Sequence, residues 1–196
     1  MNTKQYIHNA AVMLPFIVVL IALDQITKYA AVAFLMGSGP FVIIDNVLEL
    51  LYVENRGAAF GIMNGMRGFF LILAPLISLI LLAASARLPK DRLYLPLKAT
   101  FACIIAGALG NFIDRLVNGY VVDFIYFMPI DFPVFNVADI YVTCSAFALI
   151  YLVMFRYTDD DLKVFSFRQS EMQHNNTEAP DDDIDKTSSV QNVDKQ

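Results

Sequence analysis

The chain carries four long apolar stretches, separated by shorter polar segments. They cover residues 10–33, 68–87, 95–114 and 137–156. A helix needs roughly 20 mostly apolar residues to cross about 30 Å of hydrocarbon, and each stretch reaches about that length. The pattern predicts an all-α membrane protein with four transmembrane helices.

The first stretch could also be a cleavable signal peptide. Lys4 precedes its apolar run, and the small residues 31–33 follow it. Asp24 and Lys28 lie between the run and these small residues, which argues against cleavage. We therefore expect the segment to remain as a helix.

Positive charges gather on one side of the predicted membrane. With four spans, this side carries Lys4, Arg87, Lys90, Arg92, Lys98, Arg156, Lys163 and Arg168. The other side has only Lys28, Arg56, Arg67 and Arg115 on it or near it. Cytoplasmic loops are enriched in Lys and Arg, so we expect both termini to be cytoplasmic.

Two segments then lie on the outer side, 37–68 and 114–136. Residues 41–53 are rich in β-branched and aromatic side chains, which predicts a short sheet or hairpin at the membrane face. Residues 120–135 alternate aromatic rings with acids, and this composition suits the membrane interface.

The composition agrees with a membrane protein and distinguishes the C-terminal segment from the rest of the chain. The 196 residues are 57% apolar and 17% charged, whereas soluble domains have about 25% charged residues. Ten acidic and four basic residues in 158–196 give this segment a charge of −6, which accounts for the net charge of −5. We predict a membrane domain over 1–157 and an acidic, disordered cytoplasmic tail over 158–196. No Lys and Arg cluster indicates nucleic-acid binding.

Four acids lie near the outer ends of the spans. Asp24 lies four residues before Lys28 on one helix face, and Asp114 directly precedes Arg115. We expect these acids to be neutralised by their basic neighbours and to brace the fold. Ionisable groups at membrane depth are costly and therefore suggest function.

Asp123 and Asp139 have no basic neighbour in the sequence. Two close carboxylates in a poorly solvated site can divide the roles of base and acid, which suits peptide hydrolysis by water. A structural role, with Asp139 as a helix N-cap, is a second interpretation. An ion or proton pathway is a third, and the residues alone leave all three open.

The remaining polar chemistry is sparse. His8 and His174 lie near opposite ends and no HExxH motif is present, so we predict no metal site and no cofactor. Cys103 and Cys144 lie in apolar stretches and are expected to be buried free thiols. Gly107 and Gly110 place small residues three apart, which permits close helix packing.

Five strings in order carry a resemblance to a known family. They are DQITK at 24–28, NRGAAFG at 55–61, GALGNFIDR at 107–115, GYVVDF at 119–124 and FNVAD at 135–139. Together they resemble the lipoprotein signal peptidase family, bacterial signal peptidase II, over about residues 10–157. No matching motif is found in the tail.

The resemblance implies an activity and a location. It implies an aspartic endopeptidase of the bacterial inner membrane, with both termini in the cytoplasm and the site at the periplasmic side. Its substrate would be a diacylglyceryl-modified prolipoprotein, cut before the lipidated cysteine. The family's outer segment forms a small β platform, and globomycin-type cyclic peptides block its site. Membrane lipids are further expected partners, no cofactor is implied, and we expect a monomer.

The resemblance also assigns residues. It implies that Asp123 and Asp139 are the catalytic pair. Substrate-binding or supporting roles would belong to Asp24, Lys28, Asn55, Gly57, Asn111, Asp114, Arg115, Asn136 and Ala138. A small proton- or ion-coupled transporter using the same acids is the alternative, although such proteins usually show inverted repeats or interrupted helices.

Overall fold

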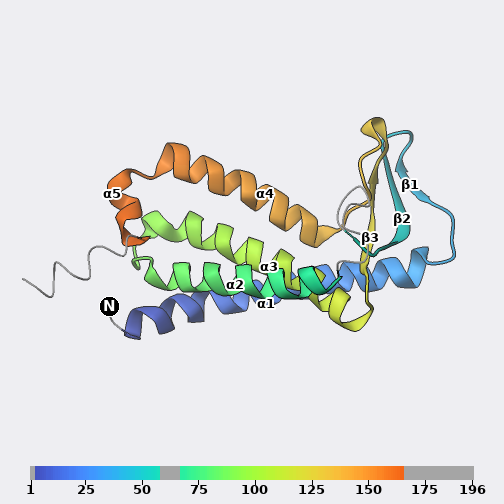
Figure 1. The fold of residues 1–196 in the computed structure, drawn as a ribbon. Helices are drawn as coiled ribbons and strands as arrows, with labels where there is room; N and C mark the ends of the chain where they lie inside the picture. The colour runs from blue at the N-terminus through green and yellow to red at the C-terminus, as the bar shows by residue number, and fades with distance from the viewer. Residues whose placement is uncertain (1–2, 58–66, 166–196) are drawn as a thin grey trace, which may run out of the picture. The chain divides into compact units, whose positions relative to one another are not determined.

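The computed structural model describes residues 3–57 and 67–165, with side chains from Asn9 onward. In this part of the chain, four helices are long and apolar enough to cross a membrane. They are α1 (Thr3–Leu35), α2 (Arg67–Arg87), α3 (Leu95–Val117) and α4 (Val137–Tyr151), which continues into a π-helix, η4 (Leu152–Arg156) (Figure 1). The predicted four-span helical membrane fold is confirmed.

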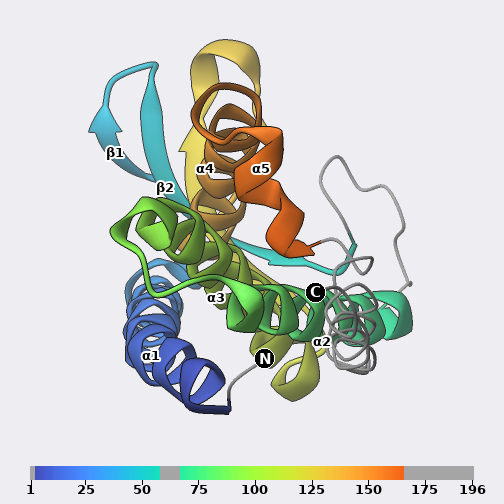
Figure 2. The same cartoon turned by 90° about the vertical axis from the view of Figure 1, so that its left-hand side faces the viewer.

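Helix α3 is the central span. It packs against α1, α2 and α4 (Figure 2), and 56% of its most apolar window is buried, against 11–17% in the other spans. A Cβ atom on Gly107 would lie 2.5 Å from the Ala138 carbonyl oxygen, and one on Gly110 would lie 2.6 Å from an Asp24 carboxylate oxygen. The two glycines therefore let α4 and α1 approach α3 closely, as predicted.

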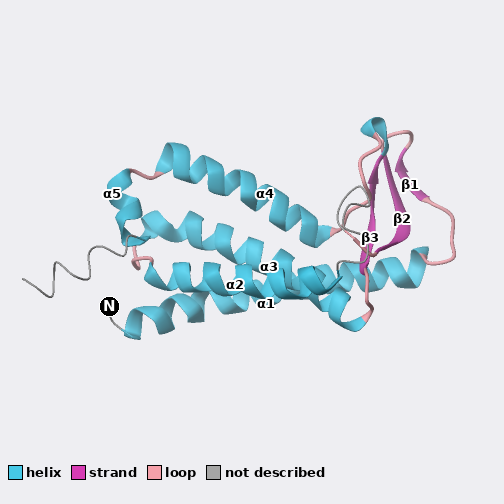
Figure 3. Cartoon of the chain, in the orientation of Figure 1, coloured by secondary structure: helices cyan, strands magenta, loops and turns pink. Residues whose placement is uncertain are grey.

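A three-stranded antiparallel sheet lies at the end of the bundle where α1 ends and α4 begins (Figure 3). Its strands are β1 (Phe41–Ile44), β2 (Leu48–Asn55) and β3 (Val121–Phe127), in that order. The hairpin predicted within 41–53 is confirmed by β1 and β2. The third strand was not predicted, since 120–135 was interpreted only as an interfacial segment.

The sheet register determines which way Asp123 points. Val122 and Phe124 on β3 join Ala31 and Leu35 of α1 in one buried apolar cluster. Side chains alternate between the two faces of a strand, so Asp123 faces away from this cluster. Burial of its two neighbours against α1 thus directs the carboxyl group toward the other face of the sheet, where it contacts Asn55 and Asn136.

The chain remains structured past the predicted end of the membrane domain. Thr158 and Asp161 form a capping box around the short helix α5 (Asp159–Leu162), which is followed by a 3₁₀ turn, η5 (Lys163–Phe165). The Tyr94 ring, from the 3₁₀ turn η2 (Arg92–Tyr94), stacks on Tyr157 with 5.8 Å between ring centroids. The Tyr94 hydroxyl donates to the main-chain oxygen of Asp161.

The chain divides into two units, residues 1–164 and 165–196. The predicted disorder of the tail concerns 158–196, and all of it beyond residue 165 lies outside the described residues. Residues 58–66, which include most of the NRGAAFG string, also lie outside them.

Candidate active site

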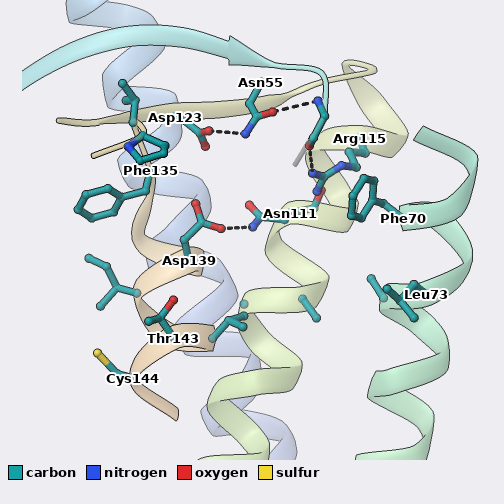
Figure 4. Close-up of a pocket in the computed structure, with 18 of the residues that line it drawn as sticks. Asn55, Phe70, Leu73, Asn111, Arg115, Asp123, Phe135, Asp139, Thr143 and Cys144 are labelled. Carbon is teal, nitrogen blue, oxygen red and sulfur yellow. Dashed lines mark hydrogen bonds between the residues drawn. The ribbon is translucent and has the colours of Figure 1, made fainter. Parts of the chain in front are cut away.

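A cavity of about 560 Å³ is lined by α2, α3, α4 and the sheet (Figure 4). Polar side chains line its sheet end, namely Asn55, Asn111, Arg115, Asp123 and Asp139. Apolar residues of the helices line the part farther from the sheet, among them Leu73, Ala74, Ile77, Gly107, Ala108 and Val142. One cavity therefore joins a polar end to an apolar wall.

Asp123 is held on both carboxylate oxygens. Its Oδ1 accepts a hydrogen bond from Asn136 Nδ2 at 2.6 Å, and its Oδ2 accepts one from Asn55 Nδ2 at 2.9 Å. Burial raises the pKa of Asp123 to about 6, and the negative charge of Asp139 contributes to this rise. The two amide donors act in the opposite direction, because they stabilise the charged form.

Asp139 lies in the first turn of α4. Its Oδ1 accepts from Asn111 Nδ2 at 2.8 Å, and its Oδ2 accepts from the main-chain N–H of Asn136 at 3.1 Å. The N-cap of α4 is Asn136, whose side chain accepts from the Asp139 N–H, so the two residues form a capping box. The interpretation of Asp139 as the N-cap itself is wrong.

Two asparagines connect the acids. Asn136 Nδ2 donates both to Asp123 and, at 3.1 Å, to Asn111 Oδ1, while Asn111 Nδ2 donates to Asp139. Asn136 is fully buried behind the cavity wall and does not line it. Figure 4 shows the Asp123 and Asp139 side chains on the same side of the cavity, near its polar end.

A buried ion triad supports these residues from α1 and α3. Lys28 Nζ lies 2.9 Å from Asp24 Oδ2 and 3.0 Å from Asp114 Oδ2, and it donates to Asn111 Oδ1 at 2.8 Å. The expected Asp24–Lys28 pair is confirmed. The expected Asp114–Arg115 pair is wrong, because adjacent residues on a helix point in different directions and Asp114 faces Lys28 instead.

The triad also holds main-chain groups next to both acids. Asp24 Oδ1 accepts from the N–H of Ala138, and Asp114 Oδ2 accepts from the N–H of Val122. Gln25, which is not among the predicted site residues, donates to Asp114 Oδ1 at 2.9 Å and to Asp24 Oδ2 at 3.2 Å. Its only signal in the sequence was its place between Asp24 and Lys28.

Arg115 brings a cation to the polar end of the cavity. Its Nη2 donates to the main-chain oxygen of Gly57 at 3.0 Å, and its guanidinium lies 4.5 Å from the centre of the Phe70 ring. Arg115 thus connects α3 to the end of β2 and to α2. Gly57 itself is buried and lines the cavity.

The thiols differ from their predicted burial. Cys103 is partly exposed, whereas Cys144 is exposed and lines the cavity. The prediction of burial failed for Cys144 because an apolar helix in a membrane exposes one face to lipid or to a cavity. Within 3–57 and 67–165, no group of three or more His, Cys, Asp or Glu side chains could hold a metal ion.

The arrangement suits acid–base chemistry on a peptide bond. Two carboxyl groups with different hydrogen-bond partners line one partly apolar cavity, so their proton affinities can differ. One can accept a proton from water while the other donates one to a leaving group.

Comparisons with known proteins identify the family of this chain. A family model described as signal peptidase (SPase) II matches residues 16–155. The chain is 43% identical over 148 residues to the lipoprotein signal peptidase of Caldanaerobacter subterraneus subsp. tengcongensis, covering 75% of this chain and 97% of that protein. It is 38% identical over 153 residues to the lipoprotein signal peptidase of Clostridium tetani, covering 76% and 97%.

The fold is also similar to that of solved structures. One described as a bacterial membrane enzyme is 33% identical, with a TM-score of 0.64, and the match covers 74% of this chain and 88% of that one. The match supports a multi-pass membrane protein, and the named relatives favour the peptidase over the transporter alternative. The chain belongs to the signal peptidase II family.

Proposed function

We propose that this protein is an aspartic endopeptidase that removes signal peptides from diacylglyceryl-modified prolipoproteins, cutting before the lipidated cysteine. The observation that carries the proposal is that Asp123 and Asp139 line one cavity and are linked through Asn111 and Asn136. The substrate is that of the relatives, whose names describe lipoprotein signal peptidases.

In the proposed mechanism, the two carboxyl groups share one proton. The charged carboxylate takes a proton from water, and the resulting hydroxide attacks the carbonyl carbon of the scissile bond. The protonated partner then donates its proton to the leaving amide nitrogen as the bond breaks. The raised pKa of Asp123 supports such a division, since a group that titrates near neutrality can exchange protons readily.

The substrate's lipid and signal helix favour a site of this composition. Both parts are apolar and would remain in the bilayer, next to the apolar wall formed by residues such as Leu73, Ala74 and Ile77. The scissile peptide bond would lie at the polar end, beside Asn55 and Arg115. Globomycin-type peptides would compete for the same cavity.

The cation-rich loop between α2 and α3 supports a topology. We infer that both termini are cytoplasmic, that the membrane is the bacterial inner membrane, and that the site faces the periplasm. We also infer that residues 1–157 act as a monomeric catalytic domain.

Two substitutions test the catalytic assignment. In purified protein with a lipidated prolipoprotein, Asp123→Asn and Asp139→Asn should each lower kcat by about a thousandfold, since each removes a proton-transfer group. Asp131→Asn is the matched control, because Asp131 lies outside the cavity and bonds to Tyr126, and it should keep wild-type activity. Near-normal turnover in either test variant would refute the assignment.

The lipid requirement is tested separately. Diacylglyceryl-modified and unmodified forms of one prolipoprotein are offered side by side to the same enzyme preparation. We expect cleavage of the modified form only. Equal rates on both forms would show that the lipid is not part of recognition.

A further inference from the structure

Thr143 lies where the polar end of the cavity meets its apolar wall. It follows Asp139 by four residues on α4, so the two side chains share a helix face about 6 Å apart along the axis. Thr143 is exposed and lines the cavity, and Figure 4 shows it between Asp139 and Cys144. A ligand in contact with Asp139 would therefore pass Thr143 on its way into the apolar part.

The Thr143 hydroxyl differs from those of Ser78 and Thr100, which lie on α2 and α3. Ser78 donates to Ala74 O at 2.8 Å, and Thr100 donates to Pro96 O at 2.9 Å, which satisfies each hydroxyl within its own helix. Among the described residues, no hydrogen-bond partner is found for the side-chain hydroxyl of Thr143, although its main chain is part of helix α4. A hydroxyl without a partner in apolar surroundings is unfavourable, so this group is available to a ligand.

The surroundings of Thr143 make it the main hydrogen-bond donor at this depth. The facing walls carry Leu73 and Ala74 of α2 and Gly107 and Ala108 of α3, none of which has a polar side chain. Among the described residues lining this part of the cavity, the only other side-chain donor is the Cys144 thiol, which donates weakly. A ligand group recognised here would be an isolated acceptor attached to apolar chains.

The proposed substrate has such an acceptor, and this inference rests on the proposed function. A diacylglyceryl group joins each acyl chain through an ester carbonyl, which accepts hydrogen bonds and cannot donate them. About eight covalent bonds of roughly 1.5 Å separate the scissile nitrogen from this carbonyl oxygen, through the cysteine sulfur and the glyceryl unit. That reach covers the rise of about 6 Å between Asp139 and Thr143.

We propose that the Thr143 hydroxyl donates a hydrogen bond to an ester carbonyl of the diacylglyceryl group and so favours ester-linked over ether-linked lipid. The bond fixes the lipid at the junction of the cavity while the acyl chains follow the apolar wall. A main-chain carbonyl of the signal peptide is the competing acceptor, and the experiment separates the two.

The experiment uses two lipidated peptides with one sequence. One carries an S-diacylglyceryl cysteine, and the other carries an S-dialkylglyceryl cysteine that lacks both carbonyl groups. The ratio of kcat/KM for the diester to that for the diether is measured for the wild type, Thr143→Val and Thr143→Ser. Valine keeps the shape without the hydroxyl, serine keeps the hydroxyl, and Thr100→Val is the matched control elsewhere on the spans.

We expect the wild type and Thr143→Ser to prefer the diester by about three- to tenfold, the effect of one neutral hydrogen bond. The ratio should fall to about one in Thr143→Val and stay at the wild-type value in Thr100→Val. An equal loss on both substrates would assign the bond to a peptide carbonyl and overturn the proposal, as would an unchanged ratio. Failure of the proposed function would appear differently, as no cleavage of either peptide by the wild type.

Discussion

The carboxylate of Asp24 accepts a hydrogen bond at 2.9 Å from the main-chain N–H of Ala138, the residue directly before Asp139. Asp114 has the equivalent relationship to Val122, the residue directly before Asp123, at 3.2 Å. Lys28 contacts both supporting carboxylates. One buried ammonium group is therefore connected, through two carboxylates, to the backbone beside each proposed catalytic acid.

This connection predicts that Asp24 positions Asp139. Asp24→Ala should lower kcat much more than it changes KM, because it frees the backbone beside Asp139 without removing a cavity-lining group. It should also lower stability by about 3–5 kcal/mol, since Lys28 loses a buried ion-pair partner. Thermal unfolding in detergent and steady-state kinetics measure the two effects.

Two further variants separate position from general destabilisation. Asp24→Asn keeps an oxygen that can accept from Ala138, so its kcat should recover toward the wild-type value even though the charge is lost. Asp45→Ala, on the exposed hairpin, should change neither quantity. The positioning role is rejected if the asparagine and alanine variants show the same kcat.

The hydrogen bond from Asn55 to Asp123 predicts that Asn55→Ala shifts the pH profile of kcat/KM. Its amide donates to Asp123 Oδ2 and stabilises the charged carboxylate, so it keeps the pKa of Asp123 lower than burial alone would. Removing the donor in Asn55→Ala should raise that pKa above about 6. The limb of the kcat/KM profile that reports Asp123 should then move to higher pH.

The sign of this shift does not depend on whether Asp123 acts as base or acid. As a control, Tyr126→Phe removes a hydroxyl that bonds to Asp131, outside the cavity, and should leave the profile in place. A limb that stays fixed or moves to lower pH in Asn55→Ala would contradict the role given to this hydrogen bond.

Gly110 predicts a steric limit beside Asp24. A Cβ atom at this position would lie 2.6 Å from Asp24 Oδ2 and 3.2 Å from Asp24 Cγ. Asp24 is fixed by Lys28 and Ala138, so it cannot move away without loss of these contacts. Gly110→Ala should lower stability by about 1–3 kcal/mol, the usual range for overpacking, and should reduce kcat.

Gly68→Ala is the matched control, because a Cβ atom there meets nothing within 4 Å. Melting temperatures of the two variants in the same detergent give the comparison. Equal stability of Gly110→Ala and Gly68→Ala would show that α1 can move away from α3 at no cost.

Residues beyond Phe165 are predicted to be dispensable for cleavage. The family model matches 16–155, and the described residues that line the cavity fall between 55 and 144. A chain ending at Phe165 keeps the Tyr94 contacts with Tyr157 and Asp161, and its kcat/KM should stay within about twofold of the wild type. A tenfold loss on the lipidated substrate would give the tail a role in turnover.

The spans and the hairpin could be predicted because their signals are local. Apolar length defines each span, and β-branched residues within 41–53 define β1 and β2. Strand β3 is as rich in β-branched and aromatic residues as β1 and β2, but the alternation of aromatics with acids over 120–135 is also typical of an interfacial segment. Its pairing with β2, more than 60 residues earlier in the chain, is a long-range contact that the sequence does not show. The structured start of the tail was missed because its contacts reach back to Tyr94.

The same difference between local signals and long-range contacts applies to the site. The Asp24–Lys28 pair lies within one helix turn and was predicted, whereas the Lys28–Asp114 pair joins two helices and was not. From the residues alone, three interpretations of Asp123 and Asp139 stay open, because sequence spacing does not place β3 beside the start of α4. Their assignment as the catalytic pair came from the resemblance and is now a proposal supported by the shared cavity.

The Asn136 side chain has two structural roles. It starts α4 as its N-cap, and the same side chain donates to Asp123. Fraying of this one helical turn would therefore remove one hydrogen bond from each acid at the same time, because Asp139 also accepts from the Asn136 N–H. A substitution that loosens the first turn of α4 should therefore disturb both carboxyl groups, even when the substituted residue contacts neither of them.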